Sequence, residues 1–112
     1  MGHEHPPSAS IQAQVRTNIA GIAELLKIDP AMTGRGTPID IDDGFIGDGY
    51  GIPTSASQEA IELAARTEAM FLDPTYTGKA MAGLVSYVRQ QRFPHGQTVV
   101  FWHTGGQVGL FA

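Results

Sequence analysis

The feature that most constrains this chain is a continuous apolar run of valine, valine, phenylalanine and tryptophan at residues 99–102. β-Branched and aromatic residues favour strands, and a run without polar alternation is typical of a strand buried on both faces of a parallel sheet. Such a strand needs neighbouring strands and covering helices. At residues 38–42, isoleucine alternates with aspartate, which predicts a shorter strand with one solvent-facing side. We therefore expect strands at 38–42 and 98–103, in an α/β fold with an open, mostly parallel sheet.

Three segments have helical patterns. The first is predicted to begin near residue 11 and to end before the Asp29-Pro30 pair, because a residue that precedes proline leaves the α region. The second is predicted over residues 56–71, and the third over residues 77–92. The predicted caps are Ser10 for the first helix and the Ser55–Gln58 capping box for the second. Candidate core residues are Ile19, Ile22, Leu26, Ile61, Leu63, Met81, Leu84, Val85, Val88, Val99, Val100 and Phe101.

Length, charge and composition exclude several classes of protein. The 112 residues are enough for one domain, which we divide into a polar segment (1–10) and a partial α/β domain (11–112). Seven basic and eleven acidic side chains give a net charge of −4 without a basic block, so no nucleic-acid partner is expected. Apolar runs are too short to span a membrane. The absence of cysteine excludes thiolate chemistry and is compatible with a reducing cytoplasm, where we expect the protein to be located.

Acidic residues do not indicate a metal site. Asp40, Asp42, Asp43 and Asp48 lack the regular spacing of a calcium-binding loop, and they are interpreted as a solvated edge. The 14 glycines and the low charged fraction of 16% disfavour a free-standing helical bundle and favour an α/β chain with many tight turns.

Candidate ligand-binding residues follow the predicted strands, because ligands of open α/β sheets bind at the carboxyl ends of strands. Thr104, Gly105 and Gly106 follow the longer strand, and the glycine-rich loop around Tyr50 follows the shorter one. Tyr76 precedes the third helix, whose first N–H groups are expected to be free for a ligand. Each feature also has an ordinary structural interpretation as a turn, a helix cap or a half-buried side chain. Lys79 is interpreted as a solvated or paired surface charge, and His103 as a strand-end residue.

Three motifs in this order make the chain resemble a known family. They are Gly-Tyr-Gly-Ile-Pro at residues 49–53, Asp-Pro-Thr-Tyr-Thr-Gly-Lys at residues 73–79 and Phe-Trp-His-Thr-Gly-Gly at residues 101–106. They resemble the C-terminal part of the D-cysteine desulfhydrase and 1-aminocyclopropane-1-carboxylate deaminase family. The resemblance implies a pyridoxal-phosphate enzyme of fold type II, similar to the β-subunit of tryptophan synthase.

The resemblance also implies roles for individual residues. Tyr50 and Tyr76 match tyrosines that face the substrate side of the cofactor, where a hydroxyl can relay a proton. Thr77, Thr104, Gly105 and Gly106 match cofactor-binding positions. The family's deaminases have a glutamate at the position of Thr77, whereas the desulfhydrases use a hydroxyl as the partner of the pyridine nitrogen. A neutral hydroxyl makes the ring a weaker electron sink, which suits β-elimination of D-cysteine to pyruvate, hydrogen sulfide and ammonia.

Two family features have no counterpart in the sequence: the lysine that forms a Schiff base with the cofactor and the glycine-rich loop that binds its phosphate. We therefore expect this chain to supply one wall of the cofactor pocket and to be inactive alone. The alternative is a non-catalytic module that self-associates or binds a partner through exposed apolar surface. A small nucleotide-binding domain is a third hypothesis, although neither a G-x-G-x-x-G motif nor a P-loop is present. A small amino acid is the expected substrate, but whether it is D-cysteine, aminocyclopropane carboxylate or another amino acid is left open.

Overall fold

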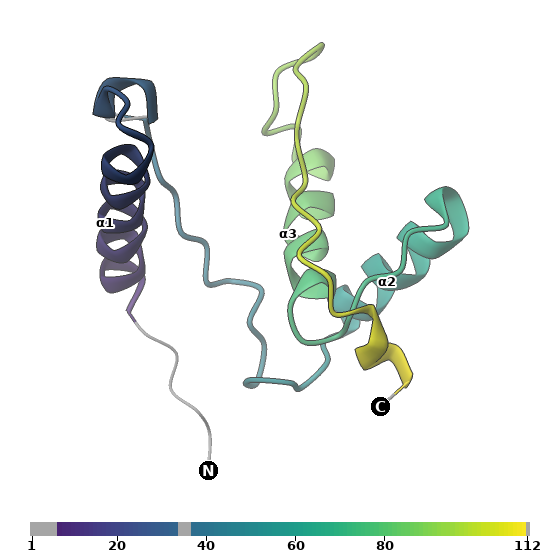
Figure 1. Ribbon diagram of the computed structural model, residues 1–112. Coiled ribbons are helices and arrows are strands. Elements are labelled where there is room, and N and C mark those ends of the chain that lie inside the picture. Colours follow the sequence, from purple (N-terminus) through teal and green to yellow (C-terminus); the bar gives the residue numbers. More distant parts are fainter. Residues whose placement is uncertain (1–6, 34–36, 112) are drawn as a thin grey trace. The chain divides into compact units, whose positions relative to one another are not determined.

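The computed structural model describes residues 7–33 and 37–111. Its regular elements are three α-helices and two 3-10 helices (Figure 1). In chain order they are α1 (Ser8–Leu26), η1 (Pro30–Thr33), α2 (Ser55–Glu68), α3 (Thr77–Arg89) and η2 (Gln107–Phe111). The chain forms two compact units that divide between Asp43 and Gly44, and each unit is described by itself. No helix among the described residues is long and apolar enough to cross a membrane.

The expected α/β fold with a parallel sheet is wrong, because residues 7–33 and 37–111 contain no strand. Residues 38–42 and 98–103 have no regular secondary structure and are not hydrogen-bonded into a ladder. Within residues 44–111, no backbone-to-backbone hydrogen bond joins 98–103 to another segment. Val100 and Trp102 are 71% and 82% exposed. A strand exists only through its partner, so β-propensity alone did not produce one here.

The three predicted helices are confirmed, but their boundaries differ. Helix α1 begins after Pro7, so Ser10 lies inside the helix and is not its cap. Helix α2 begins one residue earlier than expected, after Thr54, and its capping box consists of Thr54 and Ser57. The Ser57 N–H donates to Thr54 Oγ1 at 3.0 Å, and the Thr54 N–H donates to Ser57 Oγ at 2.9 Å. The predicted segment 1–10 lies mostly outside the described residues.

The unit made of residues 44–111 has a small core between α2 and α3. Its buried apolar residues are few and mostly small, and they are Ala60, Ala64, Leu72 and Ala82. Alanines allow two helices to approach closely, which explains why this interface buries methyl groups rather than the larger side chains. The predicted core is therefore wrong: none of its members is fully buried, and Leu63, Val88, Val99 and Val100 are exposed.

Figure 1 shows the path that matters for the site. The chain leaves α2, turns through residues 69–76 into α3, and after α3 it returns toward the start of that helix. At the end of this return, His103 contacts the Phe71 carbonyl and Gly106 lies against Asp73. Two of the sequence motifs thus meet at the N-terminal end of α3.

Candidate functional site

Asp73 organises the N-terminal end of α3. Its carboxylate is buried and accepts the backbone N–H groups of Thr75, Tyr76 and Thr77 at 2.8, 2.7 and 2.9 Å. The Thr77 hydroxyl donates to Asp73 Oδ1 at 2.6 Å and accepts the Asp73 N–H at 2.8 Å. The Asp73 carbonyl accepts the Gly78 N–H at 2.8 Å. One residue therefore satisfies the donors that a helix start would otherwise leave unpaired.

These contacts also set the charge of Asp73. Burial raises the pKa of the Asp73 carboxyl, but the Thr77 hydroxyl and the N–H groups of Thr77, Tyr76 and Thr75 stabilise the carboxylate, and the net pKa lies below its usual value. Asp73 is therefore a fixed negative charge at neutral pH. The expectation that the first N–H groups of the third helix are free for a ligand is wrong, because Asp73 occupies them.

Tyr50 and Tyr76 form an exposed pair beside this helix start. Their hydroxyl oxygens are 2.6 Å apart, and their rings meet edge to face with centroids 5.7 Å apart. The side chains are 61% and 59% exposed. The hydrogen bond with Tyr50 is the main reason why the pKa of Tyr76 is raised, with smaller contributions from burial and from the charges of Tyr50 and Asp73. The two residues predicted as catalytic, 26 positions apart, are thus brought together by the fold.

The Thr-Gly-Gly segment (residues 104–106) also lies against the start of α3. The His103 Nδ1 accepts the Gly105 N–H at 3.0 Å, so the proton of the neutral ring is on Nε2, which donates to the Phe71 carbonyl at 2.8 Å. Gly105 and Gly106 have φ angles of 99° and 86°. A Cβ on Gly106 would lie 2.8 Å from Asp73 Oδ1. Thr104 is exposed.

The predicted cofactor-binding residues thus differ in accessibility. Thr77 is buried and its hydroxyl is engaged with Asp73, whereas Thr104 and Gly106 are exposed and Gly105 is partly exposed. Whether any of them contacts a cofactor stays a prediction.

Sequence reasoning missed the structural importance of Asp73 and Lys79. An Asp-Pro pair followed by threonine at a helix start is a signal for a side chain that binds backbone N–H groups, and it could have identified Asp73. Lys79 was expected on the surface, but it is buried, with its ammonium between two backbone carbonyls. No sequence signal identifies that contact, because both acceptors are main-chain atoms of a distant loop.

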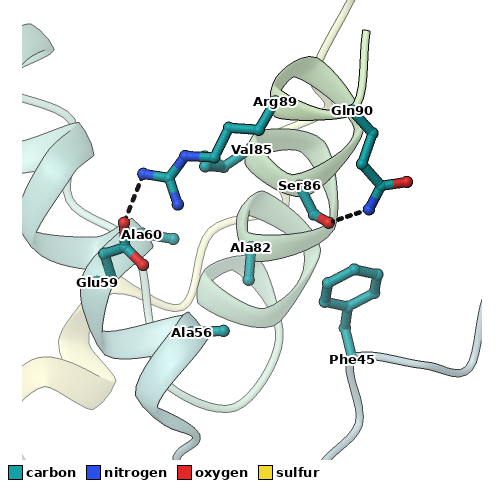
Figure 2. A pocket seen from close by; sticks show the side chains of 9 residues that line it. All are labelled: Phe45, Ala56, Glu59, Ala60, Ala82, Val85, Ser86, Arg89 and Gln90. Atoms are coloured by element: carbon teal, nitrogen blue, oxygen red, sulfur yellow. Dashed lines mark hydrogen bonds and ion pairs between the residues drawn. The ribbon is translucent and has the colours of Figure 1, made fainter. Parts of the chain in front are cut away.

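A separate pocket of about 360 Å³ lies between α2 and α3 (Figure 2). Its lining residues are Phe45, Ala56, Glu59, Ala60, Ala82, Val85, Ser86, Arg89 and Gln90. The Arg89 guanidinium donates to Glu59 Oε1 at 2.5 Å across it. This hydrogen bond is the main cause that lowers the pKa of Glu59 and raises that of Arg89. None of the predicted site residues lines this pocket, so it is distinct from the tyrosine pair.

A comparison with protein families bears directly on the site. A family model described as pyridoxal-phosphate dependent enzyme matches residues 6–105, which include the first two motifs and the third up to Gly105. The chain belongs to this family. Members of the family bind pyridoxal 5′-phosphate, and the implied cofactor class is therefore shown.

The donors at the site fit one side of pyridoxal phosphate. The exposed side chains of Tyr50, Tyr76 and Thr104 carry hydroxyls that suit the polar edge of the ring and a bound amino acid. The N–H groups of Tyr76, Thr77 and Gly78 at the start of α3 are not available to the phosphate, because Asp73 accepts all three.

Proposed function

We propose that this chain supplies the substrate-facing wall of a pyridoxal-phosphate enzyme that eliminates hydrogen sulfide from D-cysteine. The 2.6 Å pair of the Tyr50 and Tyr76 hydroxyls carries the proposal. When bound, the cofactor withdraws electrons from the amino acid's α-carbon. The overall change converts D-cysteine and water into pyruvate, hydrogen sulfide and ammonia.

The tyrosine pair is suited to the proton transfers of this reaction. Elimination transfers the proton of the α-carbon to a base, forms a double bond between the α- and β-carbons and breaks the bond from the β-carbon to sulfur. The departing sulfur takes up a proton. The raised pKa of Tyr76 keeps its Oη protonated at neutral pH, so that it can donate this proton. Tyr50 Oη lies within hydrogen-bonding distance, and a hydrogen-bonded pair of hydroxyls can pass a proton from one oxygen to the other.

Thr104 is the better of the two threonines for the pyridine nitrogen. The Thr77 hydroxyl already donates to Asp73, whereas Thr104 is exposed on the segment that packs at the start of α3. A neutral hydroxyl such as that of Thr104 as the nitrogen's partner supports β-elimination over opening of a cyclopropane ring, because it does not hold the pyridine nitrogen protonated. Gly105 and Gly106 would let the cofactor ring approach the backbone closely.

The reaction is tested in a chimera. Residues 6–105 replace the matching segment of a complete D-cysteine desulfhydrase, and pyruvate and sulfide are measured with D-cysteine, L-cysteine and aminocyclopropane carboxylate as substrates. We expect pyruvate and sulfide from D-cysteine. The proposal is overturned if the chimera instead releases ammonia and a four-carbon keto acid from aminocyclopropane carboxylate, or if it acts on L-cysteine alone.

The role of the tyrosines is tested in the same chimera. Tyr76→Phe is expected to lower kcat by a factor of about 10² to 10⁴, the usual contribution of a positioned proton donor. Tyr87→Phe is the matched control, since Tyr87 packs against Phe45 and Phe93 and under the Arg92 guanidinium. If the two substitutions lower kcat equally, Tyr76 is not the proton donor. The unmodified chain mixed with pyridoxal phosphate and D-cysteine is expected to form no pyruvate, because the ammonium of Lys79 is already bound by two carbonyls.

A further inference from the structure

Lys79 is a buried cation with an unusual pair of acceptors. The residue is 8% exposed and lies in the first turn of α3. Its Nζ donates to the Ile46 carbonyl at 2.6 Å and to the Gly49 carbonyl at 3.0 Å. Burying an ammonium group is unfavourable unless its hydrogen bonds are satisfied, so these two contacts account for its stability in this place. They join α3 to a loop 30 to 33 residues earlier in the chain.

That loop is the one that carries Tyr50. It turns sharply, with φ angles of 73° at Gly47 and 72° at Gly51, and the Gly49 carbonyl also accepts the Ile52 N–H at 3.2 Å. The Gly49 carbonyl carbon is bonded directly to the backbone nitrogen of Tyr50. A contact that holds this carbonyl in place therefore also holds the peptide plane that contains the backbone nitrogen of Tyr50. On the helix side, Lys79 follows Tyr76 by three residues, so the anchor and the second tyrosine belong to one rigid turn.

We propose that Lys79 is a positioning residue that holds the Tyr50 loop on the first turn of α3 and so sets the contact between the Tyr50 and Tyr76 hydroxyls. The lysine acts through the loop backbone and touches neither hydroxyl. The loop also has its own turn at Gly49–Ile52 and an edge-to-face contact of Phe45 with Tyr87, but Lys79 is the side chain that joins the Gly49 carbonyl to α3. The inference deepens the proposed function, on which its catalytic importance rests, but the contact itself is measurable without cofactor or substrate.

The experiment follows each tyrosine by NMR in the complete chain, labelled with ¹³C at the ring carbon that bears the hydroxyl. The chain has three tyrosines, so Tyr→Phe variants assign all signals. In the unmodified protein, Tyr76 is expected to titrate above its ordinary pKa. Tyr50→Phe removes the hydroxyl partner directly and should return the Tyr76 pKa toward about 10. Lys79→Met keeps the length of the side chain but not its donor, and it should lower the Tyr76 pKa to the same value.

A double variant separates positioning from general destabilisation. If Lys79 acts only through Tyr50, Lys79→Met combined with Tyr50→Phe should shift Tyr76 no further than either single change. Additive shifts, or an unchanged Tyr76 in Lys79→Met, would overturn the proposal. Lys27→Met is the matched control, since Lys27 is the other lysine and belongs to the unit that contains α1, and it should leave all three tyrosines unchanged.

Loss of folding is checked by circular dichroism. If Lys79→Met loses helical signal, Lys79→Gln is used, because its amide is a donor that is too short to reach both carbonyls. If both variants lose helical signal, the proposal is also overturned, since Lys79 would then be needed for α3 itself. Failure of the D-cysteine assay would leave these titrations unaffected, so the two proposals fail separately.

Discussion

Two segments of the chain, residues 72–79 and residues 98–102, both overlap a sequence motif and are partly apolar. They differ in burial and in hydrogen bonding. In the first segment, Leu72 is fully buried and Asp73 binds four donors contributed by Thr75, Tyr76 and Thr77. In the second, Val100 and Trp102 are exposed and the backbone forms no ladder. The difference lies in where the partners come from. A helix start closes its hydrogen bonds within a few residues, whereas a strand needs a second segment to pair with it.

The largest expected effect contrasts the apolar residues of the two segments. Leu72→Ala removes a fully buried side chain and should lower the free energy of unfolding by about 2–5 kcal/mol. Val100→Ala changes an exposed residue and should alter it by no more than about 0.5 kcal/mol. Urea unfolding followed by circular dichroism measures both. Similar losses in the two variants would mean that residues 98–102 are packed in solution, as Leu72 is.

The second prediction concerns the carboxylate that closes the helix start. Asp73→Asn keeps the shape but replaces one acceptor oxygen by a donor, and it should destabilise the protein by about 2 kcal/mol at neutral pH. Asp48→Asn, in an exposed part of the glycine-rich loop, is the control and should have little effect.

The same variant gives a pH dependence with a defined sign. The pKa of Asp73 is lowered by folding, so its contribution is complete above the unfolded value of about 3.9 and is lost as the pH falls through the folded pKa. The unmodified protein should therefore lose stability below about pH 4, and Asp73→Asn should lose less over the same range. Parallel acid curves would show that Asp73 is not a bound carboxylate.

The third prediction compares neighbouring glycines where the two segments meet. Gly105 and Gly106 both have positive φ angles, so alanine at either position should cost about 1–2 kcal/mol in backbone conformation. Only at Gly106 would the new Cβ also meet Asp73, at 2.8 Å, whereas nothing lies within 4 Å at Gly105. Gly106→Ala should therefore be more destabilising by about 1–3 kcal/mol. Equal losses of stability in the two variants would show that the Thr-Gly-Gly segment does not lie against Asp73.

These contrasts explain how much the sequence could predict. The three helices followed from local periodicity, and motif order correctly indicated the pyridoxal-phosphate family. The predicted sheet was wrong, because the β-propensity of residues 99–102 shows that the segment can pair with another strand. It does not show that such a strand is present. The core was missed for a related reason: large residues were chosen, but α2 and α3 pack through alanines, and Leu72 lies in a turn without periodicity.

The candidate site shows the same limit. The resemblance implied that Tyr50 and Tyr76 both face the substrate side of the cofactor, and in the structure their hydroxyls meet. The anchor that joins their two segments could not be predicted, since Lys79 binds main-chain carbonyls, and any residue type supplies those. Side-chain motifs can therefore be recognised in the sequence, whereas the backbone contacts that position those side chains cannot.

The smallest expected effect tests whether burial also decides how strongly polar contacts stabilise the pocket between α2 and α3. The Glu59–Arg89 pair has the geometry of a strong ion pair, but both side chains are more than half exposed. Water and salt screen such a pair, so Glu59→Gln should leave the thermal midpoint nearly unchanged, as should Glu62→Gln in the exposed pair with Arg66. A clear loss for Glu59→Gln alone would mean that the pocket wall is shielded from water in solution. A negligible loss, set beside that of Asp73→Asn, would show that burial rather than distance decides which polar contacts stabilise this protein.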